Sequence, residues 1–161
     1  MPPKIEQRPV DGYFEEVDQA YHKNAAIAVL AVLLMLFGLV TFVWALPFPH
    51  LGFLGKYNGY LNWASFLIAA AIYCLLRLSP MVSYLMLFLL FGFSYGIIQL
   101  EGWQKTGGPA LWLIGIIGFG VGVAIQMLIN KPADVNTGLN RLTKSPVWLL
   151  VFLLRSVKIR Y

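Results

Sequence analysis

The chain alternates between long apolar runs and short polar segments. Four runs, at residues 25–46, 60–78, 81–100 and 109–129, are each long enough to cross a membrane. Crossing about 30 Å of hydrocarbon takes roughly 20 residues at a rise of about 1.5 Å each. In lipid only a helix satisfies the backbone polar groups of a single crossing segment. The pattern therefore predicts an all-α membrane protein with four transmembrane helices.

An amphipathic pattern precedes the first run. Asp11 suits the start of a helix, and Phe14, Val17 and Tyr21 then share one face at helical spacing. A helix of this kind lies in the membrane surface with its apolar side inward. We expect residues 1–24 to form an N-terminal tail with an interfacial helix.

A similar segment follows the fourth run. Val135, Leu139 and Leu142 form an apolar stripe, and residues 146–154 form an apolar stretch too short to span. We expect 131–161 to be a second interfacial segment, after a transmembrane bundle at 25–130. Basic side chains at its end are expected to contact anionic lipid headgroups: Arg155, Lys158 and Arg160.

Composition and charge agree with a membrane location. Of 161 residues, 59% are hydrophobic and 12% charged, which is too apolar for a soluble domain of this size. Ten of the twelve Lys and Arg residues fall on one predicted side, and only Lys56 and Lys105 on the other. The positive-inside rule then places both termini in the cytoplasm. We expect the membrane to be a bacterial inner membrane. These cations form no basic groove with interleaved aromatics, so no nucleic-acid partner is expected.

Residues able to carry chemistry are few. His22 and His50 lie on opposite predicted faces of the membrane and cannot share a metal, and Cys74 is the single cysteine. All seven acidic residues lie outside the apolar runs, so none is placed to relay protons or bind an ion within the membrane. The residues therefore indicate no catalytic group, no metal site and no cofactor.

Small residues mark the fourth run. Gly115, Gly118 and Gly122 recur at helical spacing, and the last two form a GxxxG pattern that lets helices approach closely. The pattern predicts packing within the bundle or contact with another chain.

Several short matches run through most of the chain and are typical of one family. They are Asn24, Ala-Leu-Pro-Phe-Pro at 45–49, Leu-Asn-Trp-Ala at 61–64, Lys131-Pro132, Pro146, the stretch 148–155 and the ending Ile159-Arg160-Tyr161. In these features the chain resembles the small membrane proteins whose fungal member is an iron-dependent 2-hydroxy fatty acid dioxygenase. The resemblance implies a helical membrane fold and a ferrous site built from histidines and a carboxylate.

The chain departs from that family at the metal. The positions that the resemblance assigns to iron ligands are Gln19, Ala28, Ile125 and Leu128. None of these side chains replaces imidazole or carboxylate as a ligand for ferrous iron. We therefore expect a pseudoenzyme, a non-catalytic accessory subunit of a larger membrane complex, with membrane lipids and other membrane subunits as partners. Two alternatives stay open: a dioxygenase of 2-hydroxy fatty acids that holds iron differently, and a lipid- or pigment-binding membrane protein.

Overall fold

The computed structural model describes residues 9–49, 61–132 and 134–158. Within these ranges the chain is helical and forms no strand. The elements, in chain order, are α1 (Pro9–Tyr21), the short 3₁₀ helix η1 (His22–Asn24), α2 (Ala25–Trp44), α3 (Trp63–Leu78), α4 (Pro80–Lys105), α5 (Leu111–Asn130) and α6 (Val135–Ser156). The all-helical prediction is confirmed for this part of the chain.

Among the described residues, three segments are long and apolar enough to cross a membrane: Pro9–Trp44, which contains α2, and the helices α4 and α5. They are consistent with an integral membrane protein. The remaining predicted crossing corresponds to α3, which has 16 residues and is shorter than the others. The run predicted from residue 60 begins as helix only at Trp63. Four crossings therefore remain a prediction.

Local chemistry sets these boundaries. The Asn62 side chain accepts a hydrogen bond from the backbone N–H of Ser65 at 3.0 Å, and Ser65 Oγ accepts one from the Asn62 N–H. This capping box fixes the start of α3. Pro80 stands in the first turn of α4, where its missing N–H costs nothing. Asp134 caps α6 through the N–H of Thr137 at 3.1 Å.

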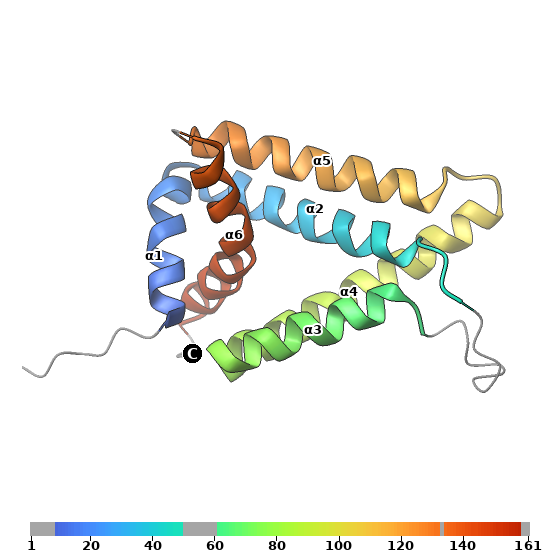
Figure 1. Cartoon of the computed structure of the whole chain (residues 1–161), viewed down its shortest axis with the longest axis horizontal. Coiled ribbons are helices and arrows are strands. Elements are labelled where there is room, and N and C mark those ends of the chain that lie inside the picture. Colours follow the sequence, from blue (N-terminus) through green and yellow to red (C-terminus); the bar gives the residue numbers. More distant parts are fainter. Residues whose placement is uncertain (1–8, 50–60, 133, 159–161) are drawn as a thin grey trace, which may run out of the picture.

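The helices α2 and α5 lie side by side and run antiparallel (Figure 1). A Cβ built on Gly115 would lie 2.5 Å from the Phe42 nitrogen, and one on Gly122 would lie 2.5 Å from the Met35 nitrogen. A Cβ on Gly118 would sit 3.4 Å from the Cα of Gly38. The three predicted glycines thus face α2 within the same chain. Such close backbone approach is how membrane helices pack in the absence of a hydrophobic driving force.

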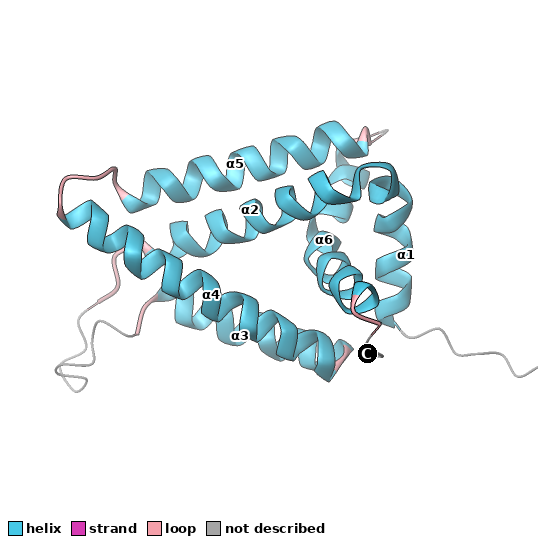
Figure 2. Ribbon diagram, turned by 180° about the vertical axis from the view of Figure 1, so that it is seen from behind, coloured by secondary structure: helices cyan, strands magenta, loops and turns pink. Residues whose placement is uncertain are grey.

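The helices α3 and α4 form a hairpin that turns at Ser79 and diverges from the α2–α5 pair (Figures 1 and 2). Ser83 Oγ donates to the Ile72 carbonyl at 3.2 Å and ties the two helices near the turn. Phe93 of α4 meets Phe37 of α2 edge to face, with ring centroids 5.3 Å apart. The two helices of the hairpin thus pack on each other, and they also contact α2 and α6.

The helices α1 and α6 lie side by side across the ends of α2 and α5 (Figure 1). The predicted face of α1 is confirmed, because Phe14, Val17 and Tyr21 are all buried. That face packs against α6, so protein covers the side chains that were expected to meet lipid. We call the α1–α6 pair the cap, and the opposite end of the long helices the distal end.

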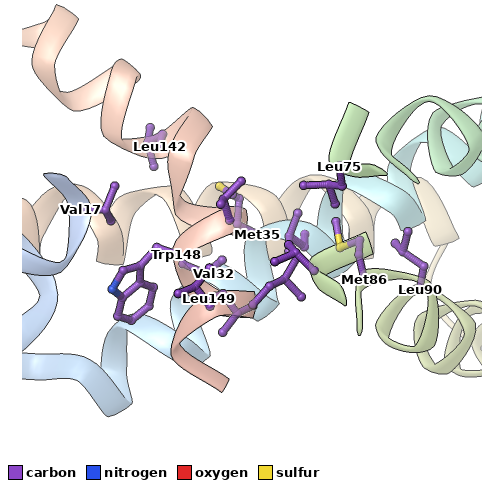
Figure 3. Packing of buried hydrophobic residues seen from close by; sticks show 14 of the residues in the cluster. Val17, Val32, Met35, Leu75, Met86, Leu90, Leu142, Trp148 and Leu149 are labelled. Atoms are coloured by element: carbon purple, nitrogen blue, oxygen red, sulfur yellow. The ribbon is translucent and has the colours of Figure 1, made fainter. Parts of the chain in front are cut away.

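The structure corrects the expectations for the C-terminal segment. Residues 135–156 form one helix that passes through Pro146. Its apolar stretch is core rather than interfacial surface, since Trp148, Leu149 and neighbouring residues are fully buried (Figure 3). In the predicted apolar stripe, Val135 and Leu139 are 79% and 57% exposed and Leu142 is buried, so its expected contact with lipid stays a prediction.

Candidate functional site

A buried polar cluster lies where α1 and α5 meet near the cap. The Tyr21 hydroxyl donates to Gln126 Oε1 at 2.8 Å and accepts from Asn130 Nδ2 at 3.1 Å. Gln126 Nε2 in turn donates to the sulfur of Met35 at 3.2 Å. All of these side chains are buried, so the hydrogen bonds join α1, α5 and α2 in a low-dielectric setting.

The helix α6 closes the same cluster. The Trp148 indole packs edge to face on Tyr21, with centroids 4.8 Å apart, and its N–H donates to Asp18 at 2.9 Å. Arg141 Nη1 approaches the Asn130 carbonyl at 3.5 Å. Asn130 Oδ1 and Arg141 Nε are buried without a partner among the described residues. The contacts that are made orient helices, and they bring no pair of acid and base groups together.

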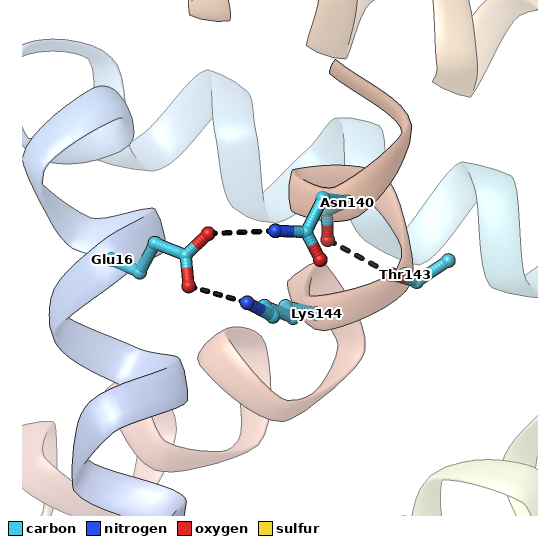
Figure 4. Close-up of polar contacts among 4 residues, drawn as sticks. All are labelled: Glu16, Asn140, Thr143 and Lys144. Carbon is cyan, nitrogen blue, oxygen red and sulfur yellow. Dashed lines mark hydrogen bonds and ion pairs between the residues drawn. The ribbon is translucent and has the colours of Figure 1, made fainter. Parts of the chain in front are cut away.

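Ionic contacts join the two cap helices at their exposed edge. The Glu16 carboxylate accepts from Lys144 and, at 3.0 Å, from Asn140 Nδ2, while Thr143 Oγ1 donates to the Asn140 carbonyl (Figure 4). Arg155 lies 3.6 Å from Asp11. Because these groups are partly exposed, each pair contributes little to stability, about 0–1 kcal/mol.

The predicted headgroup-binding cations have different surroundings. The Arg155 guanidinium lies over the Phe14 ring at 4.0 Å from its centroid, as well as near Asp11, so it has partners within the protein. Lys158 is exposed. Arg160 lies outside the described residues.

The positions that the family resemblance assigns to iron ligands do not form a common site. Ala28 is fully buried in the core, whereas Leu128 is 74% exposed and Gln19 is exposed. Ile125 is half-buried on α5. Neither their chemistry nor their placement fits an iron centre.

The described residues also contain no group of three His, Cys, Asp or Glu side chains that could hold a metal ion. His22 is exposed in η1, directly after α1, and His50 lies outside the part of the chain that the structure describes.

A hollow of about 340 Å³ opens at the distal end, where four helices end or begin. Its lining combines aromatic and polar side chains: Trp44, Phe48, Asn62, Glu101, Gln104 and Trp112. Small-molecule sites are typically concave and apolar, with a few fixed polar groups. No pattern in the sequence indicates that Trp44, Glu101 and Trp112 meet, because they lie far apart along the chain.

Comparison of the chain with protein-family models, with curated proteins and with solved structures finds no match in any of the three. In the part of the chain that the structure describes, the fold is all-helical, with three segments of membrane length and a two-helix cap.

Proposed function

We propose that this chain is an accessory subunit of a membrane complex and that its α3–α4 hairpin packs against a transmembrane helix of another protein. The observation that carries the proposal is a stripe of exposed aromatic side chains on α4, here called the aromatic stripe: Tyr84, Phe88, Phe91 and Tyr95. These side chains are 56–72% exposed. Their spacing of four, three and four residues is that of the seam in helix–helix packing.

The aromatic stripe has the shape of a helix-packing surface, with large side chains beside a small one. Gly92 lies beside it, and a Cβ built there would meet nothing within 4 Å, which leaves a notch among large rings. Large side chains next to a small one suit the close packing by which helices associate in lipid. Aromatic residues are also enriched in the cores of protein interfaces. Lipid alone demands no such spacing.

The position of the hairpin supports the same proposal. The hairpin diverges from the α2–α5 pair, so the outward side of α4 is free of the chain's other described helices (Figure 2). In this proposal both termini and the cap lie in the cytoplasm of a bacterium, in line with the distribution of Lys and Arg. The chain then keeps a helical scaffold like that of the dioxygenase family without its iron, as a pseudoenzyme.

Site-specific photocrosslinking in the native membrane tests this function. A benzoylphenylalanine at Phe91 is expected to give adducts of discrete mass that contain another membrane protein. The matched control is the same probe at Ile117, an aliphatic residue on α5 that is 61% exposed. The partner should also copurify at fixed stoichiometry in mild detergent. Adducts that contain only lipid, together with a monodisperse free monomer, would contradict the proposal.

A lipid-binding function is a second candidate, favoured by the distal hollow. The iron-dependent dioxygenase alternative has no contact among the described residues in its favour and stays a prediction. Elemental analysis of the purified protein decides it, because that alternative requires about one iron per chain.

A further inference from the structure

The distal hollow has three aromatic residues in its lining, and one of them is held in place by its neighbours. Phe48 meets Trp63 edge to face at 5.4 Å between centroids and stacks on Phe66 at 6.0 Å. Trp63 is itself fixed, because its indole N–H donates to the Pro47 carbonyl at 3.0 Å. Trp44 and Trp112 also line the hollow, and the faces of aromatic rings attract organic cations.

The charge of the lining has one sign. Glu101 contributes a carboxylate, and the described residues of the lining include no cation. Lys105 pairs with Glu101 at 2.9 Å, but its side chain is 73% exposed and directed from the next helical turn. An exposed pair of this kind is weak, so another cation can compete with Lys105 for the carboxylate. Gln104 is oriented by accepting the Leu111 N–H at 3.0 Å.

The volume and the position of the hollow limit the class of ligand that it can bind. A volume of about 340 Å³ is at the small end of the range for ligand sites. It suits a headgroup better than an acyl chain. The lining comes from the last turns of α2 and α4 and the first turn of α5, at one end of the membrane-length helices. In a bilayer that level is occupied by lipid headgroups.

From this combination of aromatic lining residues, a single carboxylate and a headgroup-level position we infer that the distal hollow binds an alkylammonium group. The group is that of phosphatidylethanolamine or phosphatidylcholine, or of a small soluble ammonium compound with the same chemistry. This inference goes beyond the proposed subunit function and does not depend on it.

Native mass spectrometry of the full chain in detergent tests the inference. Phosphatidylethanolamine and phosphatidylglycerol with identical acyl chains are added in equal amounts. We expect the ammonium lipid to be retained roughly fivefold or more over the glycerol lipid. Glu101→Gln and Trp112→Leu should each bring that ratio towards one. Two controls should leave the ratio unchanged: Glu15→Gln, an exposed carboxylate on the cap, and Trp103→Leu, an exposed tryptophan outside the lining.

A second experiment distinguishes a lipid headgroup from a soluble ammonium compound as the ligand. Tetramethylammonium is titrated while tryptophan fluorescence is followed, and choline is then used as a competitor against bound phosphatidylethanolamine. Saturable binding of tetramethylammonium that Glu101→Gln weakens would support the site with a soluble ligand. Selectivity for phosphatidylethanolamine without tetramethylammonium binding would support it with a lipid ligand. Equal retention of both lipids together with no response to tetramethylammonium would overturn the inference. So would a Glu101→Gln protein that keeps the selectivity and the melting temperature of the parent.

Discussion

Single residues show how this chain handles polar groups inside apolar helices. Thr41 Oγ1 donates to the Phe37 carbonyl at 2.7 Å, and Ser94 Oγ donates to the Leu90 carbonyl at 2.9 Å. The larger polar side chains, Gln126 and Tyr21, bond to each other instead. Burying such a group in an apolar environment without a hydrogen bond costs up to several kcal/mol. These polar side chains therefore satisfy one another or their own helix backbone, and they allow the helices to pack.

Gly38 sets the distance between α2 and α5. A Cβ there would lie 2.1 Å from the Phe119 nitrogen, which is backbone and cannot rotate away. We expect Gly38→Ala to force the helices apart and to lower stability by about 1–3 kcal/mol or more. The measurement is the thermal melting temperature of the purified protein in detergent.

Gly120 provides the matched control on the partner helix. A Cβ at Gly120 would meet nothing within 4 Å. Gly120→Ala should therefore be neutral or stabilising, by up to about 1 kcal/mol, since alanine is the better helix former. Equal melting temperatures for Gly38→Ala and the parent protein would show that the two helices are not packed as described.

At the scale of whole elements, α6 is the least expected helix, because it passes through a proline. Pro146 has no N–H to donate to the carbonyl of Leu142, one turn earlier. The Ser145 hydroxyl donates to that carbonyl at 2.8 Å and replaces the missing bond. Ser145 is fully buried, so no water is at hand to do the same.

A pair of substitutions tests this replacement. Ser145→Ala should lower the free energy of unfolding by about 1–3 kcal/mol, because it leaves a buried carbonyl without a donor. Adding Pro146→Ala restores a backbone N–H at the right position, so the double variant should recover most of the loss. The readout is thermal unfolding followed by circular dichroism. A double variant no more stable than Ser145→Ala would refute the role given to the hydroxyl.

The helices of this fold could be predicted from the sequence to very different degrees. The face of α1 follows from the spacing of Phe14, Val17 and Tyr21, and the structure buries it. The face of α6 does not follow from its apolar stripe, because Gly138 turns inward and lies against Met127, with a built Cβ 3.1 Å from its sulfur. Periodicity identifies large apolar side chains and overlooks a glycine used for close contact.

The distal hollow could not be predicted for a different reason. Its lining residues are isolated in the sequence, and each has an ordinary explanation at the end of a membrane helix. Only the packing of four helix ends brings Trp44, Glu101 and Trp112 to one place. The polar cluster near the cap shares this origin, since Tyr21 and Gln126 are 105 residues apart.

At the scale of the whole molecule, connectivity favours a fourth crossing. The helices α2 and α5 are antiparallel, so α2 ends and α5 begins at the distal end (Figure 1). If α4 spans the membrane and ends beside α5, it begins at the cap end. The helix α3 must then return the chain from the distal end to the cap end. Its 16 residues reach about 24 Å, which is short of a typical hydrocarbon core.

Cysteine accessibility decides the topology. In a Cys74→Ser background, single cysteines at Glu15, Arg77, Lys105 and Ser156, all exposed positions, are labelled with an impermeant maleimide in intact and in opened cells. Four crossings predict that positions 15, 77 and 156 react together and that position 105 reacts from the opposite side. With the cap in the cytoplasm, only position 105 should react in intact cells. Reaction of positions 77 and 105 from the same side would show that α4 does not cross, because these positions mark its two ends. The α3–α4 hairpin, and with it the aromatic stripe, would then lie outside the membrane interior.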